Sequence, residues 1–170
     1  MKILDYDRVK AVEYAKKWSM SYNPLYYNFD NIGGDCTNFA SQCLYSGSKV
    51  MNYTKNIGWY YNSSFDRSAS WTSVEYFYKF LIQNANTFDS RRDFEGPFGK
   101  SVDLNDTQIG DFVQLGDENG KFFHTLIIVG YLRDKTPLVA SHSLPSYNKP
   151  LNFYVYQKVR YIHILGVKKL

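Results

Sequence analysis

The sequence GGDCTNFASQCLYSG, residues 33–47, combines a tight turn with the start of a helix. From Cys36 onward, apolar residues recur at intervals of three and four, a spacing that places them on one helical face. Gly47 stands where a helix commonly ends. The stretch therefore predicts a helix from Cys36 to Gly47 whose buried face carries the following residues: Phe39, Ala40, Cys43 and Leu44.

Cys36 occupies the first turn of this predicted helix, where unpaired N–H groups and the helix dipole favour a thiolate. The same N–H groups could stabilise an oxyanion, and Gly33 and Gly34 allow a tight turn and the close approach of a substrate. These features indicate a nucleophile at Cys36 and a core residue at Cys43. The alternative is that Cys36 is a small buried apolar residue, since free cysteines are often buried.

A thiol nucleophile needs a base within hydrogen-bonding reach. His124 alternates along an apparent strand with Leu126 and Ile128. A hairpin turning about Arg133 would set His142 opposite His124 on the same face, so that one imidazole orients the other. A register shift of one residue would instead put them on opposite faces. His163 has no pattern that connects it to Cys36, and we expect it to be structural.

A metal site is the alternative use of the same side chains. Cys36, His124 and His142 together could hold zinc with an open fourth position. No C-x-x-C or H-E-x-x-H spacing is present, and the cysteine stands where a nucleophile is expected. We therefore expect no metal and no cofactor.

The rest of the chain predicts a single α+β domain over residues 1–170, with helices first and an antiparallel meander afterwards. A capping box, Thr72 with Glu75, indicates where one helix begins. Residues 48–71 and 83–108 have no clear period. The expected elements are helices at 6–18 and from residue 72, and strands at 111–115, 122–131, 137–142 and 159–165.

Composition narrows the classes of partner. The net charge of +4 comes from scattered basic residues, which does not indicate nucleic-acid binding, and no apolar run is long enough to span a membrane. The start, MKILDYDRVK, shows no signal peptide, so we expect a cytoplasmic protein or a domain trimmed from a secreted or cell-wall protein. Cys36 and Cys43 lie too far apart on one helix for a disulfide. The oligomeric state stays open.

Several motifs in this order resemble the bacterial putative amidase domain family, within the papain-like superfamily of NlpC-type cell-wall peptidases. The motifs are YDRVKAVEYAKKW, GGDCTNFASQCLYSG, IGDFVQL, the strand of His124, and ASHS followed by NKPL. The resemblance implies a papain-like α+β fold in which a nucleophile helix packs on an antiparallel sheet.

The same resemblance implies roles for single residues. It matches Cys36 to the nucleophile, His124 to the general base and His142 to the residue that orients the base, with Asn148 and Asn152 as rivals for that third role. Asp35 matches a helix cap or turn former. Asp111 matches a structural position, and a second oxyanion donor is unassigned.

We therefore expect a thiol-dependent hydrolase of amide or peptide bonds, with bacterial cell-wall peptidoglycan or a peptide as the substrate. One alternative keeps the fold and the thiol but transfers the acyl group to an amine or hydroxyl instead of water. Another is a non-catalytic module that uses an aromatic cleft to bind wall polymer or a partner protein. Which bond would be cleaved stays open.

Overall fold

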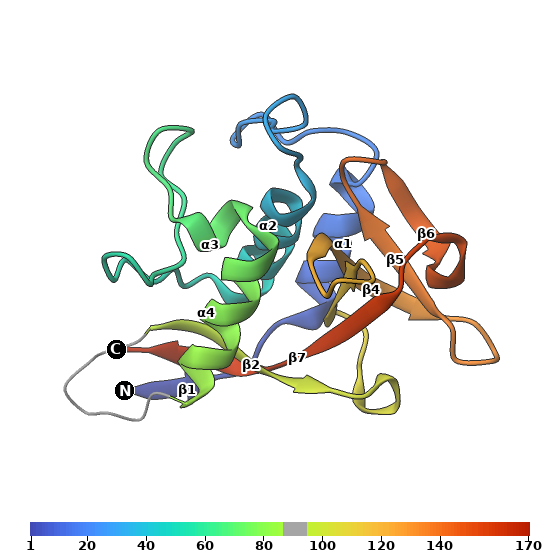
Figure 1. The fold of residues 1–170 in the computed structure, drawn as a ribbon. Coiled ribbons are helices and arrows are strands. Elements are labelled where there is room, and N and C mark those ends of the chain that lie inside the picture. The colour runs from blue at the N-terminus through green and yellow to red at the C-terminus, as the bar shows by residue number, and fades with distance from the viewer. Residues whose placement is uncertain (87–94) are drawn as a thin grey trace.

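The computed structural model describes residues 1–86 and 95–170 and shows an α+β fold, with helices packed against an antiparallel sheet (Figure 1). The helices are α1 (Arg8–Trp18), α2 (Cys36–Ser48), α3 (Ala69–Thr72) and α4 (Val74–Asn86). The strands are β1 (Lys2–Leu4), β2 (Gly96–Val102), β3 (Phe112–Gly116), β4 (Phe122–Tyr131), β5 (Pro137–Ser141), β6 (Ser146–Pro150) and β7 (Lys158–Lys169). The α+β class predicted from the sequence is confirmed.

Strand β7 organises the sheet. The strand order is β1-β7-β3-β4-β5-β6. Strand β2 lies off this path and also pairs with β7. The four strands expected from the sequence are confirmed as β3, β4, β5 and β7, within a residue or two at most ends except the C-terminal end of β7. Strands β1, β2 and β6 were not predicted. Strand β2 belongs to the segment 83–108 that had no clear period, and residues 87–94 of that segment lie outside the described residues.

Helix α1 begins two residues later than predicted because Asp7 caps it, accepting a hydrogen bond from the Lys10 N–H at 3.0 Å. Helix α2 begins at Cys36 as predicted, but it does not end at Gly47, since Lys49 takes the left-handed capping conformation. Gly47 has another purpose. A Cβ there would lie 2.5 Å from the ring of Tyr6, so the glycine allows that ring to pack on the helix.

The predicted capping box at the start of α4 is wrong. Thr72 is the last residue of α3, and Ser73 lies between the two helices and accepts the N–H of Tyr76 at 3.5 Å. Glu75 instead forms an ion pair with Arg160 of β7 at 2.9 Å. Its side chain therefore ties α4 to the sheet rather than to its own helix start.

The sheet has a packed cluster on each face. The larger cluster lies between the helices and the sheet and includes these buried side chains: Ala15, Phe39, Leu44, Trp71, Phe77, Phe112, Ile127 and Ile162. The smaller one covers the opposite face with Val113, Leu115, Leu126, Ile128, Val139 and Leu151. Alternation along β4 thus assigns odd-numbered residues to the helices and even-numbered residues to the smaller cluster.

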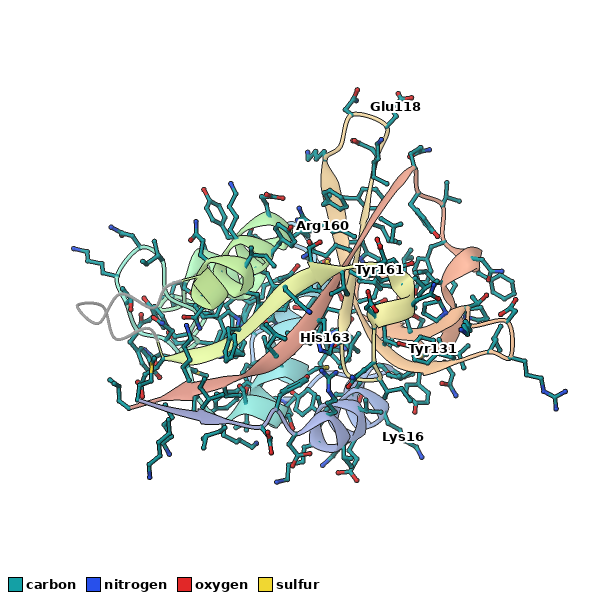
Figure 2. All side chains as sticks on the ribbon, turned by 90° about the horizontal axis from the view of Figure 1, so that it is seen from below. Lys16, Glu118, Tyr131, Arg160, Tyr161 and His163 are labelled. Atoms are coloured by element: carbon teal, nitrogen blue, oxygen red, sulfur yellow. The ribbon has the colours of Figure 1, made fainter. Side chains whose placement is uncertain are left out.

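A partly buried ionic cluster around the buried Asp111 joins α1 to the sheet. The Oδ1 atom of Asp111 accepts hydrogen bonds from the Arg8 guanidinium at 2.7 Å and from the Ile164 N–H at 3.0 Å. Its Oδ2 lies 2.7 Å from Nδ1 of His163, a residue of β7 that Figure 2 labels. These bonds support the interpretation of Asp111 and His163 as structural residues.

Candidate active site

A pocket of about 450 Å³ brings the predicted nucleophile and base together. Cys36 lines it from the first turn of α2, and His124 lines it from β4. Gly33 and Gly34 form another part of the wall in left-handed conformations, with φ of 90° and 103°, which glycine adopts without strain. The turn before α2 therefore leaves its backbone open to the pocket.

The Cys36 side chain is held against β4. Its sulfur lies 3.8 Å from the hydroxyl of Thr37, whose oxygen is 3.0 Å from the hydroxyl of Thr125. Only 7% of Cys36 is exposed, and this burial raises the pKa of its thiol, although hydrogen bonds from the Thr125 backbone and from Thr37 act in the opposite direction. Burial therefore acts against the thiolate that the helix start predicts.

Asp35 precedes α2 at the capping position, yet its side chain does not cap the helix. Its Oδ1 accepts hydrogen bonds from the Phe29 N–H and from the Asn38 side chain, both at 2.8 Å. Its Oδ2 lies 2.6 Å from Nδ1 of His142. The carboxylate thus fixes the turn from behind and leaves the N–H groups of the first helical turn, including that of Cys36, without a side-chain cap.

The structure places His142 away from His124. In the β4–β5 hairpin, Ile127 pairs with Ala140, so that continued pairing would set His142 opposite Thr125. The turn is centred on Asp134 rather than Arg133, since the N–H of Leu132 bonds to the carbonyl of Thr136, and a bulge follows in β4.

The predicted contact between the two imidazoles is therefore wrong. Nε2 of His142 lies 2.7 Å from the backbone oxygen of Trp18, and Nδ1 faces Asp35. Both ring nitrogens of His142 are occupied.

The side chain of His124 is largely shielded from solvent. The residue is 8% exposed, and its ring centroid is 5.7 Å from that of Tyr154. Burial, with a smaller contribution from the charge of Lys149, lowers the pKa of His124 to about 4. The imidazole is therefore neutral at neutral pH, which is the form a base needs.

Nε2 of His124 is buried without a hydrogen-bond partner among the described residues. Neither Asn148 nor Asn152, both exposed, bonds to it, and no hydrogen bond joins Cys36 to His124 within the described ranges. The structure thus gathers Cys36 and His124 at one pocket, with no partner for Nε2 of His124 among residues 1–86 and 95–170. Unliganded active sites often have such loose geometry.

Sequence reasoning missed two residues of the pocket wall, Lys149 and Tyr154. The hydroxyl of Tyr154 lies 2.7 Å from the Ser146 hydroxyl, and the amine of Lys149 lies 4.1 Å from the centroid of the Tyr154 ring. They come from β6 and the turn after it, which have no clear period in the sequence. The run NKPLNFY contributed the motif NKPL to the family resemblance, but it gave no separate indication that Lys149 or Tyr154 lines the site.

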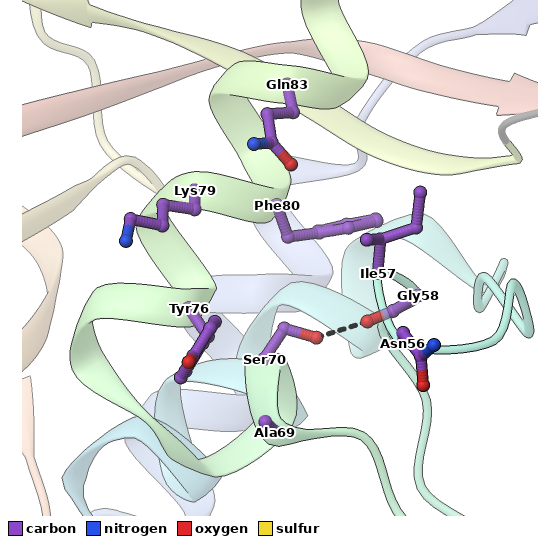
Figure 3. A pocket seen from close by; sticks show the side chains of 9 residues that line it. All are labelled: Asn56, Ile57, Gly58, Ala69, Ser70, Tyr76, Lys79, Phe80 and Gln83. Atoms are coloured by element: carbon purple, nitrogen blue, oxygen red, sulfur yellow. Dashed lines mark hydrogen bonds between the residues drawn. The ribbon is translucent and has the colours of Figure 1, made fainter.

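A second pocket, between α4 and residues 56–70, is smaller and has neither cysteine nor histidine in its wall (Figure 3). Its wall includes Ser70, whose hydroxyl donates to the Gly58 carbonyl, and Lys79, which pairs with Glu75.

Across residues 1–86 and 95–170, no group of three or more histidine, cysteine, aspartate or glutamate side chains could hold a metal ion. In the same ranges no helix is long and apolar enough to cross a membrane.

Residues 5–165 match the family described as "Putative amidase domain". The chain belongs to this amidase domain family. A similar protein is "Uncharacterized protein YhbB" of Bacillus subtilis (strain 168), 33% identical over 156 residues, which are 89% of this chain and 45% of that protein. The chain thus spans about half the length of this relative. No solved structure matches the chain significantly.

Membership of the amidase domain family suggests amide hydrolysis as the activity. The match covers both the turn and helix of Cys36 and the strand of His124. The Bacillus relative has no assigned activity in its name, so it adds nothing on substrate or mechanism.

Proposed function

We propose that the chain is a thiol-dependent amide hydrolase with Cys36 as nucleophile and His124 as general base. The observation that carries the proposal is that a cysteine at an uncapped helix start and a neutral histidine line one pocket. The helix of Cys36 packs on the antiparallel sheet that supplies His124, which is the arrangement expected of a papain-like fold. We assign the chain to the NlpC-type branch of that superfamily as part of the same proposal.

The protonation states set the order of the first step. The Cys36 thiol has a raised pKa and His124 a lowered one, so an ion pair between them is disfavoured before the substrate binds. Proton transfer from sulfur to imidazole therefore accompanies attack on the carbonyl carbon. The sulfur forms a bond to that carbon, and the carbonyl electrons move to oxygen.

The remaining steps use the same two side chains. The Cys36 N–H donates to the oxyanion of the tetrahedral intermediate. As the intermediate collapses, His124 gives its proton to the departing amine, leaving an acyl group on Cys36. His124 then takes a proton from water, whose oxygen attacks the thioester, and the thiol and a carboxylic acid are released.

The proposed substrate class is an amide or peptide bond of bacterial peptidoglycan. The resemblance to NlpC-type cell-wall peptidases supports this class. The pocket supports an acyl substrate with apolar neighbours, since much of its wall is apolar.

The test is digestion of purified peptidoglycan followed by mass spectrometry of the newly formed ends. The wild type should release amine and carboxylate ends, and digestion in H₂¹⁸O should add one ¹⁸O to each new carboxylate. Cys36→Ala should abolish release. Cys43→Ala is the matched control, because it removes the other thiol, which is fully buried in the main core. Activity retained in folded Cys36→Ala would overturn the proposal, and a product lacking ¹⁸O would identify acyl transfer to another acceptor.

A further inference from the structure

Lys149 brings a positive charge into the wall of the candidate active site. It lies in β6, where it pairs with Val139, and its side chain lines the pocket that Cys36 and His124 share. The amine lies over the ring of Tyr154, whose hydroxyl is 2.7 Å from Ser146 and 3.3 Å from Ser141. The surface beneath the amine is therefore fixed by hydrogen bonds.

This charge has no counter-ion within the described part of the chain. No ion pair involves Lys149 there, and none of the residues that line the pocket is aspartate or glutamate. The remaining wall is mostly apolar, from Leu115, Phe123, Leu144, Phe153 and Val155. A unit charge beside apolar surface attracts an anion more strongly than one in open water.

The charge acts on the His124 side of the pocket. After burial, the positive charge of Lys149 is the second cause that lowers the pKa of His124. The Tyr154 ring lies next to both His124 and Lys149. In the proposed mechanism His124 delivers the proton to the departing amine. A group bound by Lys149 therefore belongs to the amine side of the scissile bond.

We propose that Lys149 is a specificity residue that binds a carboxylate on the amine side of the substrate. This inference rests on the proposed function and narrows it to amide bonds whose departing amine is an amino acid with a nearby free carboxylate. A bound carboxylate would also cancel the charge of Lys149. The basicity of His124 would then rise when the matching substrate is in place.

The test uses two alkylating reagents that differ mainly in charge, iodoacetate and iodoacetamide. Each forms a carbon–sulfur bond to Cys36 and releases iodide, with the thiol proton passing to His124 or solvent. The rate with iodoacetate divided by the rate with iodoacetamide measures how strongly the site attracts a carboxylate near the thiol. Mass spectrometry of the Cys36 peptide gives both rates. Lys149→Gln should lower that ratio about fivefold, the effect of one charge near a site between water and protein interior.

Lys121→Gln is the matched control, because it removes the same charge from an exposed hairpin position outside the pocket. Its ratio should equal that of the wild type, and Lys149→Glu should lower the ratio further than Lys149→Gln. Protection gives a second readout: acetyl-Ala-Ala should slow iodoacetamide alkylation at lower concentration than acetyl-Ala-Ala-amide does, and Lys149→Gln should remove the difference.

The two proposals fail in different ways. If neither reagent modifies Cys36 in the folded wild type, the proposed nucleophile is wrong. If both reagents modify Cys36 but Lys149→Gln leaves their rate ratio and the protection unchanged, the specificity role of Lys149 is wrong and the hydrolase proposal stands.

Discussion

Asp35 and His142 form a buried pair behind the start of α2, with Oδ2 2.6 Å from Nδ1 and both side chains almost fully enclosed. The other ring nitrogen of His142 faces the carbonyl of Trp18, which can only accept a hydrogen bond. Nε2 therefore donates to that carbonyl, and Nδ1 faces the carboxylate of Asp35. The ring of Phe39 stacks on the imidazole at 4.1 Å.

Breaking this pair should destabilise the fold. His142→Ala leaves the Asp35 carboxylate buried without its partner, and we expect the free energy of unfolding to fall by about 3–5 kcal/mol. Urea denaturation measures the change. In the double variant Asp35→Asn/His142→Gln, the loss in free energy of unfolding should be smaller than the sum of the losses in the two single variants, because the two residues interact directly. A loss below about 1 kcal/mol in His142→Ala, the size typical of exposed pairs, would contradict the buried ionic interaction.

His124 should make stability depend on pH. Its folded pKa of about 4 lies below the ordinary value of 6.5, so between these values the unfolded chain binds a proton that the folded chain does not. Stability from this group is present above pH 6.5 and is lost as pH falls toward 4. When the pH is lowered from 7 to 4.5, the free energy of unfolding of His124→Gln should fall by about 2 kcal/mol less than that of the wild type. Urea denaturation at the two pH values measures both changes. An NMR titration midpoint near 6.5 would refute the shift.

The acid limb of activity should follow the same group. Because His124 must be neutral to accept the thiol proton, kcat/KM should stay level as pH falls through 6.5 and decline only near 4. The measurement is a pH–rate profile on the substrate identified by the peptidoglycan digest. A decline centred near 6.5 would show that the base is another group or that His124 is more solvated than its burial indicates.

The resting state of Cys36 should be a thiol. Because burial raises its pKa, iodoacetamide should modify it more slowly than glutathione at pH 7, and the rate should still be rising above pH 9.0, the ordinary value for cysteine. Mass spectrometry of the Cys36 peptide follows the reaction, with fully buried Cys43 as an internal reference. A rate that is already level at neutral pH would instead indicate a thiolate–imidazolium pair.

Gly47→Ala tests the packing of Tyr6 on α2. Alanine favours helix by about 1 kcal/mol over glycine, but its Cβ would lie 2.5 Å from the Tyr6 ring and 2.6 Å from the Asp7 backbone oxygen. We expect a net loss of about 1–3 kcal/mol in the free energy of unfolding. Gly130→Ala is the control, since its new Cβ would make ordinary contacts with Leu138. A stabilised Gly47→Ala variant would show that the ring can move.

The spacing of apolar residues predicted the elements that bury one continuous apolar face. Helix α2 and strands β3, β4, β5 and β7 have such patterns, and the structure confirms them. Strand β2, with the sequence GPFGKSV, contains two glycines and a proline and is formed by pairing with β7, some 60 residues further along the chain. Strands β1 and β6 are short, at three and five residues. Strands β1 and β2 depend on a partner far along the chain, which no local rule identifies, whereas β6 pairs with the neighbouring β5 but its sequence SYNKP has no apolar alternation.

The site was predictable where the signal is local and not where it is long-range. The positions of Cys36 and His124 follow from a turn before a helix and a strand pattern. The contact of His142 with Asp35 crosses 107 residues, and it was missed because the hairpin turn is centred one residue later than Arg133 and a bulge follows. The protonation state of Cys36 depends on burial by neighbours, which spacing alone does not reveal.

The central place of β7 also decides when the protein can fold during synthesis. Strand β7 is the pairing partner of β1 and β2 and one of the two partners of β3, so β1 and β2 have no strand to pair with until this segment leaves the ribosome. The helices and the β4–β5 hairpin can form beforehand from local contacts, whereas closure of the sheet waits. We therefore expect β1 and β2 to join the sheet only after β7 has been translated, whereas all residues that line the candidate pocket, 33–155, precede β7 in the chain.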